Sequence, residues 1–382
     1  MDQTPLNSQI EIDGRNFTVE TSFLPQRNRA LSHIHLGGRT ISQREYDLPE
    51  NPDEETVRRV LQDTHRSRSV ELESVFRLNR KIDEKPTADT CTKMGVVLLA
   101  NGFYNEAKVK FQKAIEMDAD HLQAMKNYGV TLTLMEDYEG AIAMLNRAKE
   151  LGQGYADVYY HLGNVHLYRR ELDEAVQHYL QALQINPRYA DAHLKLAAAC
   201  MGYLLSAGTT LLDSKVGELC ARAKQESDTA AALNPKLRNR AFMMAQDYLR
   251  VKKYSLSFQN FMEVRPKYVP RIGDEIIFFF TLTLLYGSEG IDLQMTEQYI
   301  DKLTAVIEEY PHYADLHHHL GVAYLIKSRF DVNRSMKEFK KALEINPKFQ
   351  KAVDQSREAE ELHRTVLAVL RKAIIQQAQP GS

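Results

Sequence analysis

Small side chains recur along this chain at a fixed interval of 34 residues. Glycine stands at positions 95, 129 and 163, and two sets of alanines keep the same step. These alanines are Ala107, Ala141 and Ala175, and then Ala114, Ala148 and Ala182. A period of about 20 to 50 residues is typical of arrays in which similar units stack on one another. The period therefore constrains the chain to an elongated array rather than a set of unrelated domains.

The recurring residues have a physical role at these positions. A glycine lets one helix approach its partner closely, and the alanines allow the same approach from a second helix. Proline ends such a helix, because it lacks the amide hydrogen that the next turn requires. Pro187, Pro235 and Pro347 each follow an Ile-Asn or Leu-Asn pair in that position. The repeating unit is therefore predicted to be two packed helices.

This pattern resembles the tetratricopeptide repeat, a 34-residue unit of two antiparallel helices. On its frame the units span 88–121, 122–155, 156–189, 190–237, 238–271, 272–313 and 314–349. The first three match at full length, whereas the fourth needs an insertion of 14 residues. The tryptophan often found at the fourth position of the unit is absent from the chain. The resemblance implies a superhelix whose concave face binds peptides or helices of partner proteins.

The first 87 residues are predicted to form a small α+β domain. Two runs of strand-forming residues each contain a hairpin turn dipeptide, Asp13-Gly14 and Gly37-Gly38. Residues 51–82 follow as a helix, because Asp53 can cap its start and Pro86 lies just beyond its end.

The other end of the chain is predicted to close the array. Residues 350–382 place apolar side chains at helical spacing, as a C-terminal capping helix and tail require. The fold class is thus mainly α: a superhelical solenoid of about seven repeats over residues 88–349, preceded by the domain of residues 1–87.

Composition excludes several classes of function. The formal net charge of −2 does not indicate binding to nucleic acid. Residues 276–286 form the longest apolar run, which is too short to span a bilayer as a helix, and we expect no secretory signal. Three cysteines at unrelated spacings predict neither a disulfide framework nor a zinc site. We therefore expect a cytoplasmic, bacterial protein with no membrane span.

The chain is predicted not to be an enzyme. None of the common local motifs for phosphate binding, dinucleotide binding, zinc proteases or serine hydrolases occurs in it, and we expect no cofactor. Repeat arrays also seldom provide a dry pocket with rigidly aimed catalytic groups.

A group of histidines raises the alternative of a metal site. Residues His317, His318 and His319 are consecutive, and His312 precedes them. Adjacent helical residues point about 100° apart, so three in a row cannot bind one metal. On the repeat frame His317 takes a packing position and His319 lies on the inner surface. Structural or groove-lining histidines are favoured, while a metal bound by His312 with His318 or His319 remains the alternative.

The concave face implied by the resemblance has a polar half. Its residues are Lys126, Asn127, Asp157, Tyr160, His161, Asn164, Tyr168, Asp191 and Lys195, with His318 and His319 in the last unit. This set is partly similar to the carboxylate clamp with which some members of the family hold a partner's C-terminal acid. It departs from the clamp at Val130, where asparagine is expected, and at Asp191, where lysine is expected.

The same face is predicted to turn apolar towards the C-terminus. The apolar half comprises Phe242, Ile277, Phe280, Leu284 and Val322. Exposed apolar patches of this kind usually bind a partner. The alternative is that these side chains form an internal core.

These observations favour a protein-interaction scaffold that binds a peptide or helical segment of another protein. A segment with an acidic portion and an apolar portion would match both halves of the predicted face. The runner-up is a regulatory or accessory subunit of an enzyme complex that acts through the N-terminal domain. A metal-dependent enzyme built on the histidine group is the third hypothesis.

Overall fold

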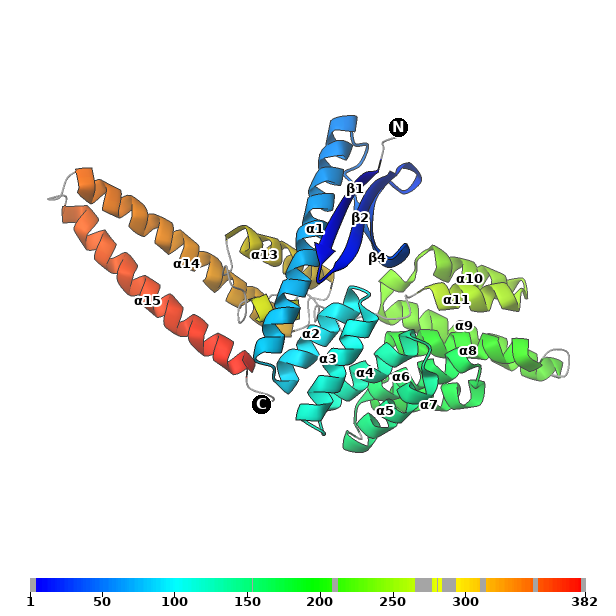
Figure 1. The fold of residues 1–382 in the computed structure, drawn as a ribbon. Coiled ribbons are helices and arrows are strands. Elements are labelled where there is room, and N and C mark those ends of the chain that lie inside the picture. Colours follow the sequence, from blue (N-terminus) through cyan, green and yellow to red (C-terminus); the bar gives the residue numbers. More distant parts are fainter. Residues whose placement is uncertain are drawn as a thin grey trace. The chain divides into compact units, whose positions relative to one another are not determined.

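The computed structural model describes residues 5–152, 154–207, 212–264, 277–279, 281–283, 293–309, 314–345 and 350–378. The chain divides into two compact units. One unit combines Met1–Phe103 with Pro270–Ser382, and the other is Tyr104–Val269. Figure 1 follows the chain from the strands at the N-terminus to the long helices near the C-terminus.

The N-terminal residues form one antiparallel sheet with strand order β1-β2-β3-β4. The strands are β1 (Leu6–Ile12), β2 (Arg15–Leu24), β3 (Arg29–Leu36) and β4 (Arg39–Asp47), with a short 3₁₀ helix η1 (Pro25–Arg27) before β3. Both predicted hairpins are present, and Asp13, Gly14, Gly37 and Gly38 all have the positive φ that tight hairpin turns need. Pairing of β2 with β3 joins the two hairpins into a single sheet.

Helix α1 (Glu54–Glu84) covers one face of this sheet, as Figure 1 shows. Asp53 caps its start, as predicted, by accepting a 2.8 Å hydrogen bond from the Thr56 amide. The rings of Phe17 on β2, Phe76 on α1 and Phe103 pack together, with centroid separations of 4.9 to 6.1 Å. The alternation of apolar and polar residues in the strands thus places one face of the sheet against α1.

Four charged and polar groups connect the sheet to the helices behind it. The Arg44 guanidinium on β4 donates to Glu71 at 2.9 Å and to the Asn101 side chain at 3.0 Å. The guanidinium of Arg68, which is 1% exposed, donates to the same Glu71 at 2.8 Å and to Ser42 at 2.9 Å. We call Arg44, Arg68, Glu71 and Asn101 the N-terminal polar network.

The second unit consists of helices that pack in consecutive pairs. They are α3 (Tyr104–Met117), α4 (Leu122–Leu134), α5 (Tyr138–Leu151), α6 (Ala156–Arg169), α7 (Leu172–Ile185), α8 (Ala190–Ala207), α9 (Asp213–Leu233), η3 (Pro235–Leu237), α10 (Arg240–Arg250) and α11 (Tyr254–Glu263). The pairs are α4 with α5, α6 with α7, α8 with α9, and α10 with α11. In three of these pairs a residue with positive φ follows the first helix: Glu136, Arg170 and Lys252. A residue in the left-handed conformation therefore begins each of these turns.

The periodic small residues lie at helix contacts, as the sequence predicts. A Cβ added to Gly129 would lie 2.6 Å from the Leu145 side chain, and one added to Gly163 would lie 2.6 Å from the Tyr179 ring. All six periodic alanines are fully buried. The 34-residue period therefore records how closely the helices of each pair approach.

The fourth pair accommodates its extra residues by lengthening both helices. Helix α8 has 18 residues and α9 has 21, whereas α4 to α7 have 13 or 14. The insertion predicted for residues 190–237 thus lengthens both helices of this pair.

The first unit also contains α2 (Ala88–Ala100), α13 (Leu293–Glu309), α14 (Ala314–Ile345) and α15 (Gln350–Ala378). A helix pair is predicted for residues 314–349, but the structure has one continuous helix, α14, over 32 residues. The apolar residues Val322, Ile326 and Phe330 stay in register through the expected turn, so the helix buries one stripe without interruption. His317, predicted to pack between helices, is exposed. Helix α15 occupies the place predicted for the capping helix.

Candidate protein-binding site

Helices α4 and α6 are the first helices of two successive pairs, and they lie against each other. The Lys126 ammonium on α4 donates a 2.6 Å hydrogen bond to the Asp157 carboxylate on α6. The lysine side chain is 9% exposed and the aspartate side chain 34%. A cationic residue of one repeat therefore neutralises the negative charge of an aspartate in the next repeat.

His161 lies within the field of this ion pair. Burial, with a smaller contribution from the positive charge of Lys126, lowers the pKa of His161 to about 4, while Asp157 acts in the opposite direction. Burial also opposes ionisation of Asp157, but Lys126 outweighs it and holds the pKa of that carboxyl below its usual value. At neutral pH the imidazole is uncharged, so it offers one donor and one acceptor.

An aromatic ring lies beside His161 and packs against a second ring just before α8. The Tyr160 ring lies 5.2 Å from the His161 ring and 5.0 Å from the Tyr189 ring, measured between centroids. The hydroxyl of the buried Tyr179 donates to the Asn164 side-chain oxygen at 2.8 Å. These contacts hold Tyr160, His161 and Asn164 in place on α6.

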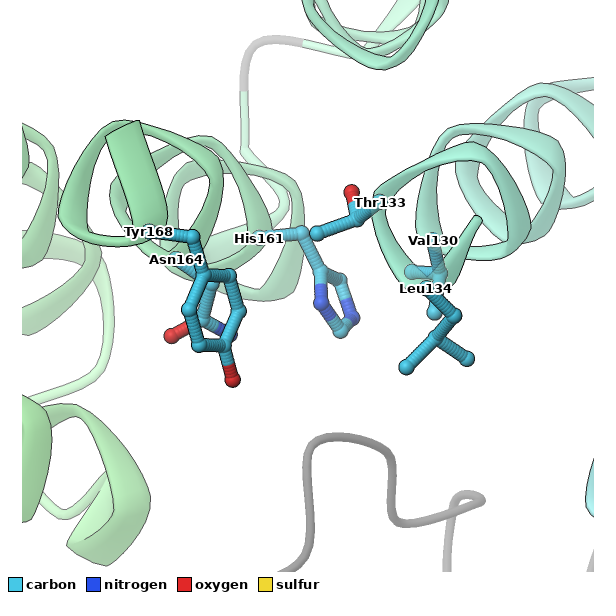
Figure 2. A pocket seen from close by; sticks show the side chains of 6 residues that line it. All are labelled: Val130, Thr133, Leu134, His161, Asn164 and Tyr168. Atoms are coloured by element: carbon cyan, nitrogen blue, oxygen red, sulfur yellow. The ribbon is translucent and has the colours of Figure 1, made fainter. Parts of the chain in front are cut away.

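A shallow pocket lies where α4 and α6 meet. Its lining residues are Val130, Thr133 and Leu134 from α4, and His161, Asn164 and Tyr168 from α6; we call these six the α4–α6 surface. Figure 2 shows Leu134, His161 and Tyr168 projecting to the same side of the two helices. The pocket volume of about 10 Å³ holds roughly one water molecule, so this surface suits a chain lying across it rather than an enclosed small molecule.

Other residues predicted for the polar half lie deeper. Asn127 is 5% exposed, and its side-chain nitrogen has no hydrogen-bond partner among the described residues. Lys195 on α8 is 2% exposed, and Asp191 is half-buried. Burial of both lysines leaves little free positive charge to attract an acidic partner.

The residues predicted for the apolar half are core side chains where the structure describes them. Phe242 is 3% exposed and packs in one unit beside Phe261 and Ala245. Ile277 and Val322 are 7% and 6% exposed and belong to a hydrophobic core of the other unit. Phe280 and Leu284 lie outside the described residues.

The histidine group does not form a metal centre among the described residues. His318 is exposed and His319 half-buried, with their rings edge-to-face at 5.5 Å. His312 lies outside the described residues. Within the described ranges no three or more His, Cys, Asp or Glu side chains come together as metal ligands would.

Thr133, Leu134 and Tyr179 were not among the predicted site residues. The 34-residue step contains a signal for one of them, because Leu134 occupies the position in its repeat that Tyr168 occupies in the next. Val130 and Asn164 correspond in the same way. Tyr179 has no such signal, since its hydroxyl becomes relevant only when α7 packs against α6.

Comparison with known families agrees with this geometry. A family model described as a tetratricopeptide repeat matches residues 98–164, and a second model with that description matches residues 156–189. Residues 98–189 are tetratricopeptide repeats. In the described ranges, no helix has the combination of length and apolar composition needed to cross a membrane.

Two curated proteins are similar over part of the chain. The human tetratricopeptide repeat protein 12 is 26% identical over 136 residues, which is 36% of this chain and 18% of that protein. The UDP-N-acetylglucosamine–peptide N-acetylglucosaminyltransferase of Giardia intestinalis is 33% identical over 107 residues, which is 27% of this chain and 7% of that protein. The similarity thus spans less than a fifth of either relative.

Several solved structures match parts of the chain at low identity. Pseudomonas aeruginosa pilF is 16% identical, with 61% of this chain and 96% of that chain covered at a TM-score of 0.37. MamA from Desulfovibrio magneticus is 17% identical, with 46% and 92% covered at a TM-score of 0.36. YrrB, a tetratricopeptide repeat protein with an unusual peptide-binding site, is 16% identical, with 50% and 92% covered at a TM-score of 0.33.

Proposed function

We propose that this protein is an interaction scaffold and that its α4–α6 surface binds a segment of another protein. The observation that carries the proposal is the alignment of Leu134, His161 and Tyr168 on one side of successive repeats. Solenoid proteins use extended surfaces of this kind to bind partners along several units. The repeat assignment of residues 98–189 supports this class of function.

The chemistry of the surface indicates an uncharged or apolar segment. Lys126 is already neutralised by Asp157, and His161 is neutral at physiological pH. Burial raises the pKa of Tyr168 to about 12, so its phenol also stays uncharged. Gripping a terminal carboxylate would require breaking the ion pair between Lys126 and Asp157. We therefore favour an internal segment over a C-terminal acid.

The segment would combine two kinds of contact. An aliphatic side chain fits beside Val130 and Leu134, which supply the apolar part of the surface. Hydrogen bonds from the segment's backbone amides to His161 and Tyr168 would fix its direction. Contacts of this kind repeat at equivalent positions, so a partner longer than one repeat extends along the array.

A displayed library of random peptides, selected on the full-length protein, tests the proposal. We expect selected peptides to bind Tyr168→Ala or His161→Ala about tenfold more weakly than wild type, because truncating a central aromatic residue removes a large part of the binding free energy. Val109→Ala is the matched control, since Val109 is 59% exposed on α3 and lies outside the surface. Circular dichroism confirms that each variant is folded.

Equal binding to wild type and to both α4–α6 variants would contradict the proposal. It would favour the accessory-subunit alternative, in which the N-terminal domain makes the contact. That alternative is best tested with point variants on the exposed face of the sheet. Deletion of residues 1–87 would also remove the partners of Asn101 in the N-terminal polar network.

A further inference from the structure

Helix α14 continues past the helix on which it packs. Its first half lies against α13, where the Lys327 ammonium is 2.9 Å from the Glu297 carboxylate. Helix α13 begins at Leu293, so α14 extends beyond it (Figure 1). The ion pair shows the chemistry of this face: a cation on α14 meets an acid on the neighbouring helix.

The exposed continuation of this face is a groove with a basic rim. Leu293, Phe330, Asn333, Arg334, Met336, Lys337 and Lys340 line a volume of about 420 Å³. Three of these side chains are apolar and three are cationic. Among the side chains that the structure describes, no acid forms an ion pair with Arg334, Lys337 or Lys340. The groove therefore lacks the acidic neighbour that Lys327 has.

Helix α15 of the same chain presents the complementary chemistry. Glu358, Glu361, Leu362, Thr365 and Val369 are exposed, and their spacing places them on one stripe about 100° wide. Leu362 is 52% exposed, so its side chain adds apolar surface to this stripe. In the described part of the chain, Glu358 and Glu361 have no ion-pair partner. The stripe is thus acidic and apolar where the groove is basic and apolar.

The two complementary surfaces lie at the same level along the hairpin, counted from the end of α14 and the start of α15. Helices α14 and α15 pack side by side and run in opposite directions. Arg334 lies eleven residues before the end of α14 at Ile345, and Glu361 lies eleven residues after the start of α15 at Gln350. Lys337 and Glu358 lie eight residues from the same ends.

This placement suits a two-fold arrangement of two identical chains. In such an arrangement a surface of one copy meets a different surface of the other, and the reverse contact forms at the same time. A two-fold axis parallel to the helices of the hairpin turns each α15 towards the α14 groove of the other copy and keeps residues at the same level along the helices opposite each other. Arg334 then faces the second copy's Glu361, and Lys337 faces the second copy's Glu358.

We propose that the α14–α15 hairpin is a dimerisation surface for a second copy of this chain. Helix α15 of each copy lies in the α14 groove of the other, and the four helices form an antiparallel bundle. Leu362 enters the groove beside Met336, so the contact removes an exposed leucine from water. The charge rows set the register of the bundle, as charged flanking positions do in coiled coils.

Charge reversal in the full-length protein tests the proposal. We expect sedimentation velocity to give a dimer for wild type across a micromolar series, with weaker association at high salt. Lys337→Glu or Glu358→Lys alone should weaken the dimer about tenfold or more, because each places like charges face to face. The double variant Lys337→Glu/Glu358→Lys should restore the dimer, since each reversed charge again meets its opposite on the other copy.

Arg329→Glu is the matched control, because Arg329 is exposed on α14 but does not line the groove. The Arg329→Glu protein should sediment as a dimer over the same concentration range as wild type. Two outcomes overturn the proposal: a wild-type protein that is monomeric into the hundreds of micromolar, or a dimer whose dissociation constant neither single reversal changes. Circular dichroism of the single variants separates loss of the interface from loss of the fold.

Discussion

At the scale of single residues, the repeat is defined by contacts that tolerate almost no added volume. Gly163 faces the Tyr179 ring, and the hydroxyl of Tyr179 in turn holds Asn164 on the α4–α6 surface. One periodic glycine thus contributes both to packing and to the position of a proposed binding residue.

We expect Gly163→Leu to destabilise the protein by about 1–3 kcal/mol, because the new side chain overpacks the contact with Tyr179. Neighbouring repeats depend on each other, so the loss should spread beyond this pair. Gly217→Ala is the control: its added Cβ meets nothing within 4 Å in α9, and it should stabilise by about 0.5–1 kcal/mol. Urea denaturation measures both. A Gly163→Leu protein as stable as wild type would show that the contact is not close.

His161 should make stability depend on pH. Its pKa is about 4 in the folded protein, against an ordinary value of 6.5. As pH falls from about 6.5 towards 4, the unfolded chain takes up a proton that the folded chain does not, so the free energy of unfolding decreases. His161→Gln should reduce this decrease between about pH 7 and pH 5. Since burial also lowers the pKa of His65 and His178, the measurement is the difference between variant and wild type. An identical pH dependence would contradict the assignment.

At the scale of elements, the N-terminal polar network determines how the sheet sits on its helices. Burial opposes ionisation of Glu71, but Arg44 and Arg68 outweigh it and lower its pKa to about 2. The stability that this ionised carboxylate contributes is present above its ordinary pKa of 4.5 and is lost as pH falls towards 2. One carboxylate therefore balances two guanidinium groups from different elements.

Removing that carboxylate should be costly. We expect Glu71→Ala to destabilise the protein by about 3–5 kcal/mol, because it leaves the buried Arg68 charge without its partner. Glu73→Ala, at an exposed position on the same helix, should change stability by no more than about 0.5 kcal/mol. Thermal and urea denaturation compare the two variants. Similar stabilities would mean that the network contributes little to folding.

At the scale of the whole molecule, the two proposals place different tasks on different units. The α4–α6 surface belongs to the unit Tyr104–Val269, and the α14–α15 hairpin belongs to the other unit. A dimer formed through the hairpin carries two α4–α6 surfaces. Two linked surfaces bind a partner with two matching segments more tightly than one surface does, because the second binding step becomes intramolecular. Substitutions in the α4–α6 surface should leave dimerisation unchanged. Substitutions in the α14–α15 hairpin should leave the binding of a single segment at each α4–α6 surface unchanged.

Local chemistry and the 34-residue period were sufficient to predict several features of the fold. The glycine and alanine spacing predicted helix pairs, Asp53 predicted the start of α1, and two turn dipeptides predicted the hairpins of the sheet. Each of these follows from contacts within a few residues or from a step repeated along the chain. Long-range packing sets which distant groups meet. It paired Lys126 with Asp157, buried Phe242 and Val322, and continued α14 through an expected turn. The charge of a groove and the burial of an apolar side chain depend on these long-range partners, which periodicity alone does not specify.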